Sequence, residues 1–186
     1  MDSNFFALIS RMRYIARWGL MRNALPENIQ EHSHMVAVLA HALGVIRRDI
    51  FHQPCDVNAL ATAALYHDAS EILTGDLPTP IKYHNAEIMS AYHAVEDLAV
   101  QKLLGMLPPE LRETYADVLA EDKAGDIYPL VKAADKLSAY IKCIEERKAG
   151  NNEFLSAEAQ TRAALEASPL PEVQYFLEHF IPAFER

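Results

Sequence analysis

The chain has few cysteines and no long apolar run, and each shortage excludes a class of protein. Its 186 residues include only two cysteines, Cys55 and Cys143, which form no CxxC pair. Neither a disulfide framework nor a thiolate zinc site is therefore expected. No stretch approaches the roughly 18 apolar residues of a membrane span, and the N-terminal residues lack the pattern of a secretory signal. We expect a cytoplasmic protein with no membrane partner.

Positive charge is also scarce, since 17 Lys and Arg residues face 26 Asp and Glu residues and give a formal net charge of −9. Binding of a nucleic acid polymer depends mainly on Lys and Arg contacts with phosphates, so a DNA or RNA partner is not expected. A small phosphorylated molecule stays compatible, because one arginine and one metal ion reverse the potential locally in a pocket.

The alternation of period two that marks half-buried strands is missing, and apolar residues recur at helical spacing instead. With 51% apolar and 23% charged residues and no repeat, the sequence predicts an all-α protein with a single compact domain over residues 1–186. Asp56 is expected to cap the third helix, and the two prolines of residues 76–85 predict an extended loop. Predicted helices cover about 5–18, 28–48, 57–73, 86–107, 109–120, 128–150, 153–167 and 172–183.

Three predicted helices carry polar residues where the helical pattern calls for apolar ones. His32 lies in EHSH, His67, Asp68 and Glu71 lie in YHDASEILTGDLPTP, and Asp135 lies in KAADKLSAY. Helical geometry would place Glu71 one turn from His67. An aspartate such as Asp135 is costly to bury among Val, Ala and Leu unless it is paired, hydrogen-bonded or bound to a metal. Polar residues that violate the pattern in this way are expected at functional sites.

Each of these residues also has a structural interpretation when it is taken alone. A histidine such as His32 is more often exposed on a helix than bound to a metal, and Asp135 would pair on the surface with Lys132 or Lys136. His34 is not expected to bind the metal, because it lies two positions after His32 and therefore on a different side of the helix.

Taken in order, the segments resemble the H…HD…D pattern of the HD superfamily of metal-dependent phosphohydrolases. RYIARWGLMRN, ENIQEHS, YHDASEILTGDLPTPIKY, KAADKLSAYIKC and GNNEF resemble in particular the YfbR-type 5′-deoxynucleotidases, over nearly the whole chain. The resemblance implies an HD fold and an enzyme that hydrolyses deoxyribonucleoside 5′-monophosphates in preference to ribonucleotides. It also implies a homodimer, for which the apolar segment YFLEHFIPAF is one candidate interface.

The resemblance further implies a metal site formed by His32, His67, Asp68 and Asp135. Two imidazoles and two carboxylates suit one divalent transition metal ion, such as Co, Mn or Zn. Glu71 takes the place of the catalytic acid or base.

A second group of residues is implied to contact the substrate. Arg17 would orient the phosphate, because a guanidinium matches phosphate geometry and stays charged. The Trp18 ring would occupy the space of a ribose 2′-hydroxyl, and Asp76 would accept a hydrogen bond from the 3′-hydroxyl. The implied catalytic residues are Glu71, Arg17 and Asp76, and the implied substrate contacts are Arg17, Trp18, Asp68, Asp76, Leu77, Pro78, Thr79 and Asp135.

Three other functions are compatible with part of this pattern. A phosphodiesterase or nucleoside triphosphohydrolase would need cations beyond Arg17, for which Lys82 and Arg22 are candidates. A regulatory module that binds a nucleotide without turnover would lack a ligand or Glu71, and none is missing here. A buried polar network without a metal would be stable to chelation, because a bound metal stabilises the native state.

Overall fold

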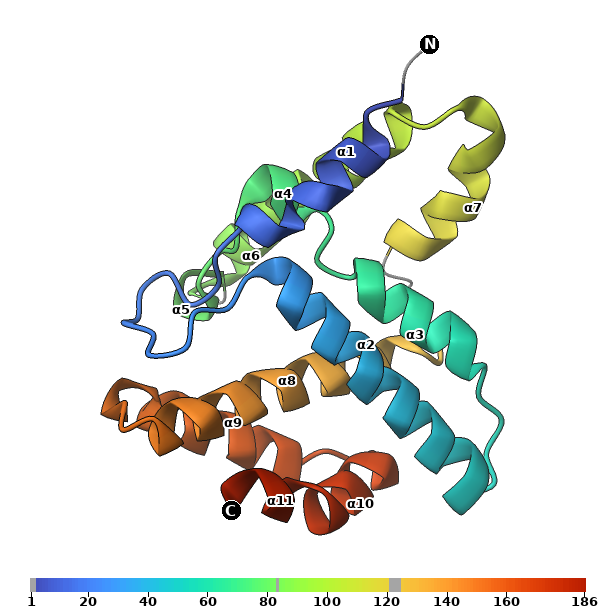
Figure 1. Ribbon diagram of the computed structural model, residues 1–186. Helices are drawn as coiled ribbons and strands as arrows, with labels where there is room; N and C mark the ends of the chain where they lie inside the picture. Colours follow the sequence, from blue (N-terminus) through green and yellow to red (C-terminus); the bar gives the residue numbers. More distant parts are fainter. Residues whose placement is uncertain (1–2, 83, 121–124) are drawn as a thin grey trace.

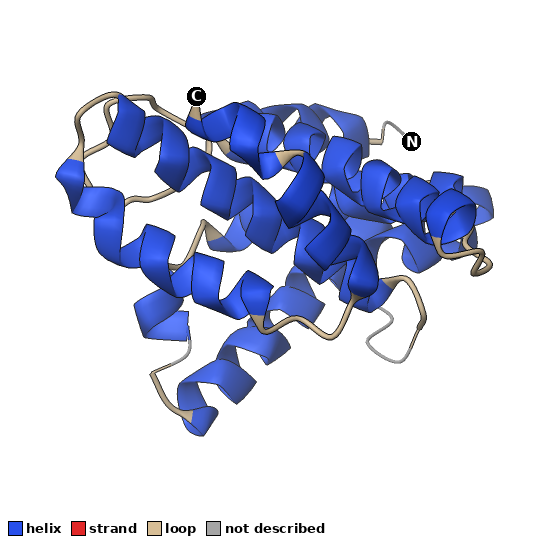
Figure 2. Ribbon diagram, turned by 90° about the horizontal axis from the view of Figure 1, so that it is seen from below, coloured by secondary structure: helices blue, strands red, loops and turns tan. Residues whose placement is uncertain are grey.

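The computed structural model describes residues 3–82, 84–120 and 125–186. Within these residues all regular secondary structure is helical, and the only strand-like pairing is an isolated bridge between Ala16 and Asn28 (Figures 1 and 2). The prediction of an all-α fold is confirmed. The α-helices are α1 (Phe5–Ile9), α2 (Ile29–Val45), α3 (Val57–Tyr66), α4 (Glu71–Thr74), α5 (Thr79–Lys82), α6 (Ala86–Gly105), α7 (Pro109–Leu119), α8 (Tyr128–Lys148), α9 (Leu155–Glu166), α10 (Pro171–His179) and α11 (Ile181–Glu185).

Helix α2 is the central element and packs against both α3 and α8 (Figure 1). Buried side chains of these helices and of α9, α10 and α11 form the larger apolar cluster, which includes Leu43, Leu60, Leu137, Ile144 and Phe176. Full burial of one such side chain contributes roughly 1.5–3 kcal/mol relative to exposure. The larger cluster therefore fixes the positions of the helices that carry His32 and Asp135.

Helices α2 and α3 approach each other closely at Gly44. A Cβ atom at this position would lie 3.0 Å from both Leu60 Cδ2 and Val57 Cγ1. The small residue therefore lets the two helices pack at this distance.

A smaller apolar cluster lies beside α3 and joins α1, α6 and α7. Its buried members include Phe5, Leu103 and Leu119 together with Ala69. Because Ala64 belongs to the larger cluster, the chain passes from one cluster to the other across residues 65–68. The His67-Asp68 pair therefore lies at the junction of the two clusters.

Helix starts follow the expected local chemistry. The Asp56 carboxylate accepts hydrogen bonds from the amides of Asn58 and Ala59, which confirms the predicted cap of α3. Helix α2 begins with a capping box, in which Asn28 accepts from the Glu31 amide and Glu31 accepts from the Asn28 amide.

Three predicted segments differ from the structure. The helix expected over 57–73 ends at Tyr66 and gives way to turns before α4. The loop expected over 76–85 contains one helical turn, α5, because a proline such as Pro80 is compatible with the first turn of a helix. The last predicted helix is divided into α10 and α11 before Pro182, whose missing amide hydrogen interrupts the hydrogen-bond ladder.

The first predicted helix is also shorter than expected. Helix α1 ends at Ile9, and residues Ser10–Tyr14 continue as a 3₁₀ helix.

No helix among the described residues is both long and apolar enough to cross a bilayer.

Candidate metal centre

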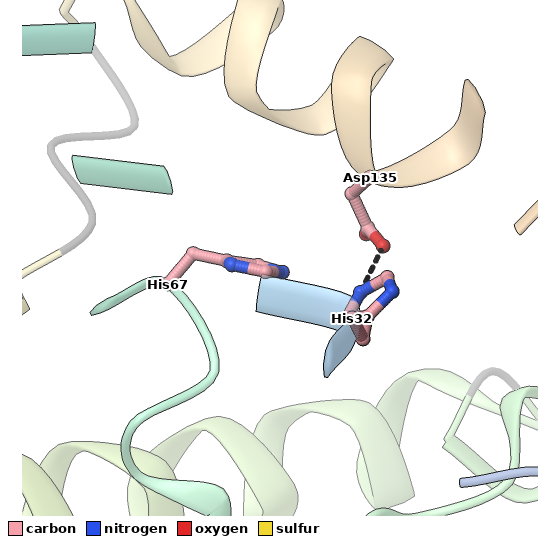
Figure 3. A group of neighbouring side chains, drawn as sticks. All are labelled: His32, His67 and Asp135. Atoms are coloured by element: carbon pink, nitrogen blue, oxygen red, sulfur yellow. Dashed lines mark ion pairs between the residues drawn. The ribbon is translucent and has the colours of Figure 1, made fainter. Parts of the chain in front are cut away.

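Three segments that are distant in the sequence meet at one point. His32 comes from α2, His67 from the turn after α3, and Asp135 from α8, and their side chains point toward one another (Figure 3). One ligand atom of each residue lies within 4.8 Å of the other two. Two helices held by the larger apolar cluster and the turn at its edge thus assemble the group.

His67 explains why α3 ends where it does. Its ring Nδ1 lies 2.7 Å from the carbonyl oxygen of Ala64, which in a continuing helix would accept from the amide of Asp68. An imidazole that donates from Nδ1 keeps the lone pair on Nε2. The same contact therefore ends the helix and leaves Nε2 free to bind a cation.

His32 is fully buried on α2 and is fixed from α8. Its Nδ1 lies 3.2 Å from the hydroxyl of Ser138, which is also buried. Its Nε2 lies 3.1 Å from Asp135 Oδ1 and 3.5 Å from Asp68 Oδ2. Ser138 was not predicted from the sequence, although it lies one helical turn from Asp135.

Asp68 faces both histidines but has a second partner. Its Oδ2 lies 3.1 Å from His67 Nε2 and 3.4 Å from Arg17 Nη1. Asp68 does not belong to the group of three residues within 4.8 Å of one another. Its carboxylate therefore connects the histidines with Arg17.

The electrostatics of the group favour a cation at its centre. Burial opposes ionisation, but His67, His32 and Arg17 hold the pKa of Asp68 well below its usual range. Burial also opposes ionisation of Asp135, and His32 and His67 nevertheless lower its pKa. Burial likewise disfavours a charged His67, but Asp68 and Asp135 raise its pKa. Two ionised carboxylates therefore stabilise positive charge between the rings.

The residues fit a divalent metal ion. The Nε2 atoms of His32 and His67 are buried and make no hydrogen bond of good geometry with any described residue, although carboxylate oxygens lie nearby. Buried polar atoms without partners need a reason, and an unplaced ion is one. Imidazole and carboxylate donors without thiolate match the ligands of Zn, Mn or Co rather than those of a structural Cys site.

Arg17 lies beside Asp68, and Arg17 and Trp18 share a partner that the sequence did not predict. Arg17 Nε lies 3.2 Å from Glu27 Oε2, and Trp18 Nε1 lies 2.9 Å from the same oxygen. Burial lowers the pKa of Arg17, but Asp68, Asp135 and Glu27 raise it by a larger amount. The net pKa lies above its usual value, so the guanidinium stays charged. The only signal for Glu27 in the sequence is its position before the Asn28 cap.

Glu71 and Asp76 interact electrostatically with Asp68 and Arg17. Glu71 is buried at the start of α4, and its Oε2 has no hydrogen-bond partner in the part of the chain that the structure describes. Burial together with Asp68 and Asp76 raises the pKa of Glu71 to about 10. Asp76 is half-buried between α4 and α5, where burial raises its pKa although Arg17 and the Trp18 amide oppose that rise.

The other predicted contacts lie in the same loop or outside the described part. Leu77 and Pro78 are half-buried between α4 and α5, and Thr79 begins α5 with a side chain that lies outside the described residues. His34 is exposed on α2 and does not belong to the group that includes His32. The structure thus brings the predicted ligands, Glu71, Arg17 and Asp76 to one region and keeps His34 away from it.

Comparison with known proteins gives consistent results over nearly the full length. A family model described as 5′-deoxynucleotidase YfbR-like matches residues 4–184. The 5′-deoxynucleotidase YfbR of Shigella boydii serotype 18 is 51% identical over 184 residues, which cover 98% of this chain and 92% of that protein. The protein of the same name from Escherichia coli ATCC 8739 is 50% identical over the same shares.

Solved structures agree with the fold. An HD-domain phosphohydrolase from Listeria innocua superimposes with a TM-score of 0.86 at 24% identity, covering 97% of this chain and 88% of that one. The cyanophage S-2L HD phosphohydrolase, solved with dA and one catalytic Zn²⁺ ion, gives a TM-score of 0.62 at 26% identity and covers 100% and 97% of the two chains. Sequence, fold and the His-His-Asp group lead to one conclusion: the chain belongs to the YfbR-like 5′-deoxynucleotidase family of HD-domain phosphohydrolases.

Proposed function

We propose that the protein hydrolyses deoxyribonucleoside 5′-monophosphates to deoxynucleosides and inorganic phosphate, with one divalent transition metal ion. Family membership supports the reaction class. The observation that carries the proposal is the pair of buried, unpartnered imidazole nitrogens that face two ionised carboxylates, with a charged arginine on one of them. Such a site can hold a cation and a phosphate side by side.

His32, His67, Asp68 and Asp135 would hold the metal. When bound, such an ion polarises a phosphoryl oxygen and makes a water molecule a better nucleophile near neutral pH. The solved cyanophage relative carries Zn²⁺, and the donor set here suits Zn, Mn and Co alike.

The residues of the chain itself bind the substrate and move the proton. Arg17, whose pKa is raised by the surrounding carboxylates, binds the phosphate through the nitrogens that Glu27 does not occupy. Hydrolysis breaks the bond between phosphorus and the sugar O5′ oxygen, and that oxygen takes up a proton. Glu71 supplies this proton, because it is buried next to the ligands and its Oε2 makes no hydrogen bond with a described residue.

Two further residues select the sugar. The Trp18 ring lies against the sugar and leaves no space for a 2′-hydroxyl, while Asp76, next to the Trp18 amide, accepts a hydrogen bond from the 3′-hydroxyl. Leu77, Pro78 and Thr79 complete the contact with the nucleotide.

The triphosphohydrolase alternative has less support. Lys82 and Arg22 were the additional cations that a triphosphate would need. Lys82 Nζ lies 2.8 Å from Glu96 Oε1, and the exposed Arg22 forms an ion pair with Glu153. Arg17 is therefore the cation that is best placed beside the proposed ligands.

Phosphate release tests the proposal directly. The protein is stripped of metal, reloaded separately with Mn, Co, Zn or Mg, and assayed with 5′-dNMPs, 5′-NMPs, 3′-dNMPs and dNTPs. Metal-dependent release confined to 5′-dNMPs is the expected result. Release from dNTPs, or no release from any substrate, contradicts the proposal.

A further inference from the structure

The Arg17-Trp18 pair is held from one side by Glu27. The backbone of residues 15–18 runs antiparallel to residues 27–29, with the Arg17 amide 3.0 Å from the Glu27 carbonyl and the Ile29 amide 2.9 Å from the Ile15 carbonyl. Glu27 therefore lies opposite Arg17 in the backbone pairing. The Glu27 side chain also forms hydrogen bonds with the side chains of Arg17 and Trp18.

One carboxylate oxygen of Glu27 accepts two hydrogen bonds. Glu27 Oε2 accepts a hydrogen bond from Trp18 Nε1 at 2.9 Å and another from Arg17 Nε at 3.2 Å. The side chains of Glu27 and Arg17 are only 15% and 13% exposed. Arg17 Nε is bound to Glu27, while the outer nitrogen Nη1 lies 3.4 Å from Asp68 Oδ2. Glu27 thus fixes the direction of the cation and of the indole ring together.

The backbone of Trp18 is held in an unfavourable conformation. Its φ angle is +60°, in the left-handed region that costs a residue with a Cβ atom free energy relative to glycine. The ring packs on Phe154 with centroids 5.1 Å apart. The bond to Glu27 and this ring contact are the side-chain interactions that keep the indole in place.

The rest of the loop does not depend on Glu27. The buried carboxylate of Glu146 accepts the amides of Ala24 and Leu25 at 2.8 and 2.9 Å, and also binds Lys142 and Asn151. A change at Glu27 therefore leaves the anchor of residues 24–25 intact. Its effect on Arg17 and Trp18 can be measured separately from folding.

We propose that Glu27 is a positioning residue that holds the phosphate-binding Arg17 and the sugar-facing Trp18 as one unit, so that rejection of ribonucleotides depends on Glu27. The proposal rests on the proposed function, because it assigns the origin of the sugar preference. A carboxylate that only neutralised Arg17 would change phosphate affinity equally for both sugars. A carboxylate that also holds the indole changes the ratio between the sugars.

The test compares Glu27→Ala and Glu27→Gln with the wild type and with Glu153→Gln as the matched control. Glu153 contacts Arg22 of the same loop, whereas the side-chain hydrogen bonds described for Arg17 and Trp18 go to Glu27 and Asp68. The kcat/KM values for 5′-dAMP and 5′-AMP are measured with the most active metal. In Glu27→Ala the deoxy-to-ribo ratio falls at least about fivefold, the range expected for one lost hydrogen bond, while Glu27→Gln gives a smaller fall and Glu153→Gln none.

Fluorescence supplies a second readout that does not need turnover. Trp18 is the only tryptophan of the chain, so its emission reports this place alone. Loss of the Glu27 acceptor should shift the emission maximum and raise quenching by acrylamide in Glu27→Ala. Trp18→Ala supplies the ratio expected when the ring is removed altogether, and bound metal, measured by elemental analysis, should stay at the wild-type content in every variant.

The outcomes separate the two proposals. An unchanged sugar ratio or unchanged emission in Glu27→Ala overturns the role of Glu27, and loss of metal assigns Glu27 a structural role instead. If Glu27→Ala does not fold, the same two readouts in Glu27→Gln decide. A wild type that turns over neither sugar contradicts the proposed function, whereas the emission of the variants still shows whether Glu27 holds Trp18.

Discussion

At the scale of single residues, hydrogen bonds to Nδ1 orient the two histidines. His67 is fixed by a backbone carbonyl, which no substitution removes, and His32 is fixed by the Ser138 hydroxyl. Partners of this kind set the orientation and basicity of metal-binding histidines. The contribution of Ser138 is therefore accessible to mutation.

We expect Ser138→Ala to lower the affinity for the metal about 10–100-fold, the usual effect of removing a partner behind a ligand. Competition with a chromogenic chelator measures this affinity without turnover. Ser33→Ala is the matched control, because Ser33 is also buried next to His32, but its hydroxyl has no hydrogen-bond partner among residues 3–82, 84–120 and 125–186. Equal affinities for Ser138→Ala and the wild type would show that the ring does not depend on Ser138.

Glu71→Gln should lower kcat about 10²–10⁴-fold, the usual contribution of a positioned acid or base. The amide keeps the size of the buried side chain but does not exchange a proton. Metal content and the binding of 5′-dAMP should stay at the wild-type level, which elemental analysis and calorimetry measure. Undiminished turnover would remove Glu71 from the proposed proton transfer.

The sequence indicated which polar residues lie together at the candidate site better than it indicated the residues that support them. His32, His67, Glu71 and Asp135 were visible because each interrupts an apolar helical pattern. Glu27 follows a proline in a polar segment and interrupts no pattern, so only the fold shows that it faces Arg17.

At the scale of elements, most helices were predicted, but the end of α3, where His67 lies, was not. Spacing predicted α2 and α8 because long apolar periodicity is independent of tertiary contacts. The end of α3 is different, since the His67 ring takes the carbonyl that the next turn would use. A side chain that replaces the backbone in this way leaves no trace in the pattern of apolar residues.

Two glycines, one at the contact between α2 and α3 and one at the end of α6, should respond differently to substitution. Gly44→Val should destabilise the protein by about 1–3 kcal/mol, because its side chain would enter the space of Leu60 and Val57. Gly105→Ala, at the end of α6 with no atom within 4 Å of a new Cβ, should be neutral or stabilise by up to about 1 kcal/mol. Urea denaturation of both variants checks the pair, and a Gly44→Val variant as stable as the wild type would refute the close contact.

The anchor on α8 predicts how the loop before α2 responds to acid. Burial opposes ionisation of Glu146, but Lys142 and Asn151 lower its pKa to about 2 from an ordinary value of 4.5. A pKa that is lower in the folded state means that Glu146 stabilises the fold above about pH 4.5, and that this contribution is lost as the pH falls toward 2. Thermal unfolding should therefore show Glu146→Gln less stable than the wild type at pH 7, with a gap that narrows below pH 4.5. A gap that is constant with pH would contradict this role.

At the scale of the whole molecule, the metal would connect α2, α8 and the turn between the two apolar clusters. Adding metal to the stripped protein at 100 times its Kd should stabilise the fold by about 2.7 kcal/mol, which for a chain of this size raises Tm by about 5–10 °C. Differential scanning calorimetry of stripped and reloaded protein measures the shift. Asp135→Asn should strongly reduce this shift of Tm. A wild-type Tm that does not change when metal is added would favour a polar network without an ion.

Assembly stays a prediction of the resemblance. The segment YFLEHFIPAF, which was the candidate interface, places Phe176 and Ile181 in the larger cluster of its own chain and leaves Phe180 about half exposed. Sedimentation equilibrium of the wild type tests the expected homodimer.

The left-handed backbone of Trp18 has a consequence for how such an enzyme changes under selection. Glycine would suit this φ angle without strain, but it would also lose the packing on Phe154 and the hydrogen bond to Glu27. Under the proposed function, the substitution that relaxes the backbone would also open the sugar site. Selection for a stable chain and selection for sugar discrimination would therefore act on the same side chain, and both would retain tryptophan here.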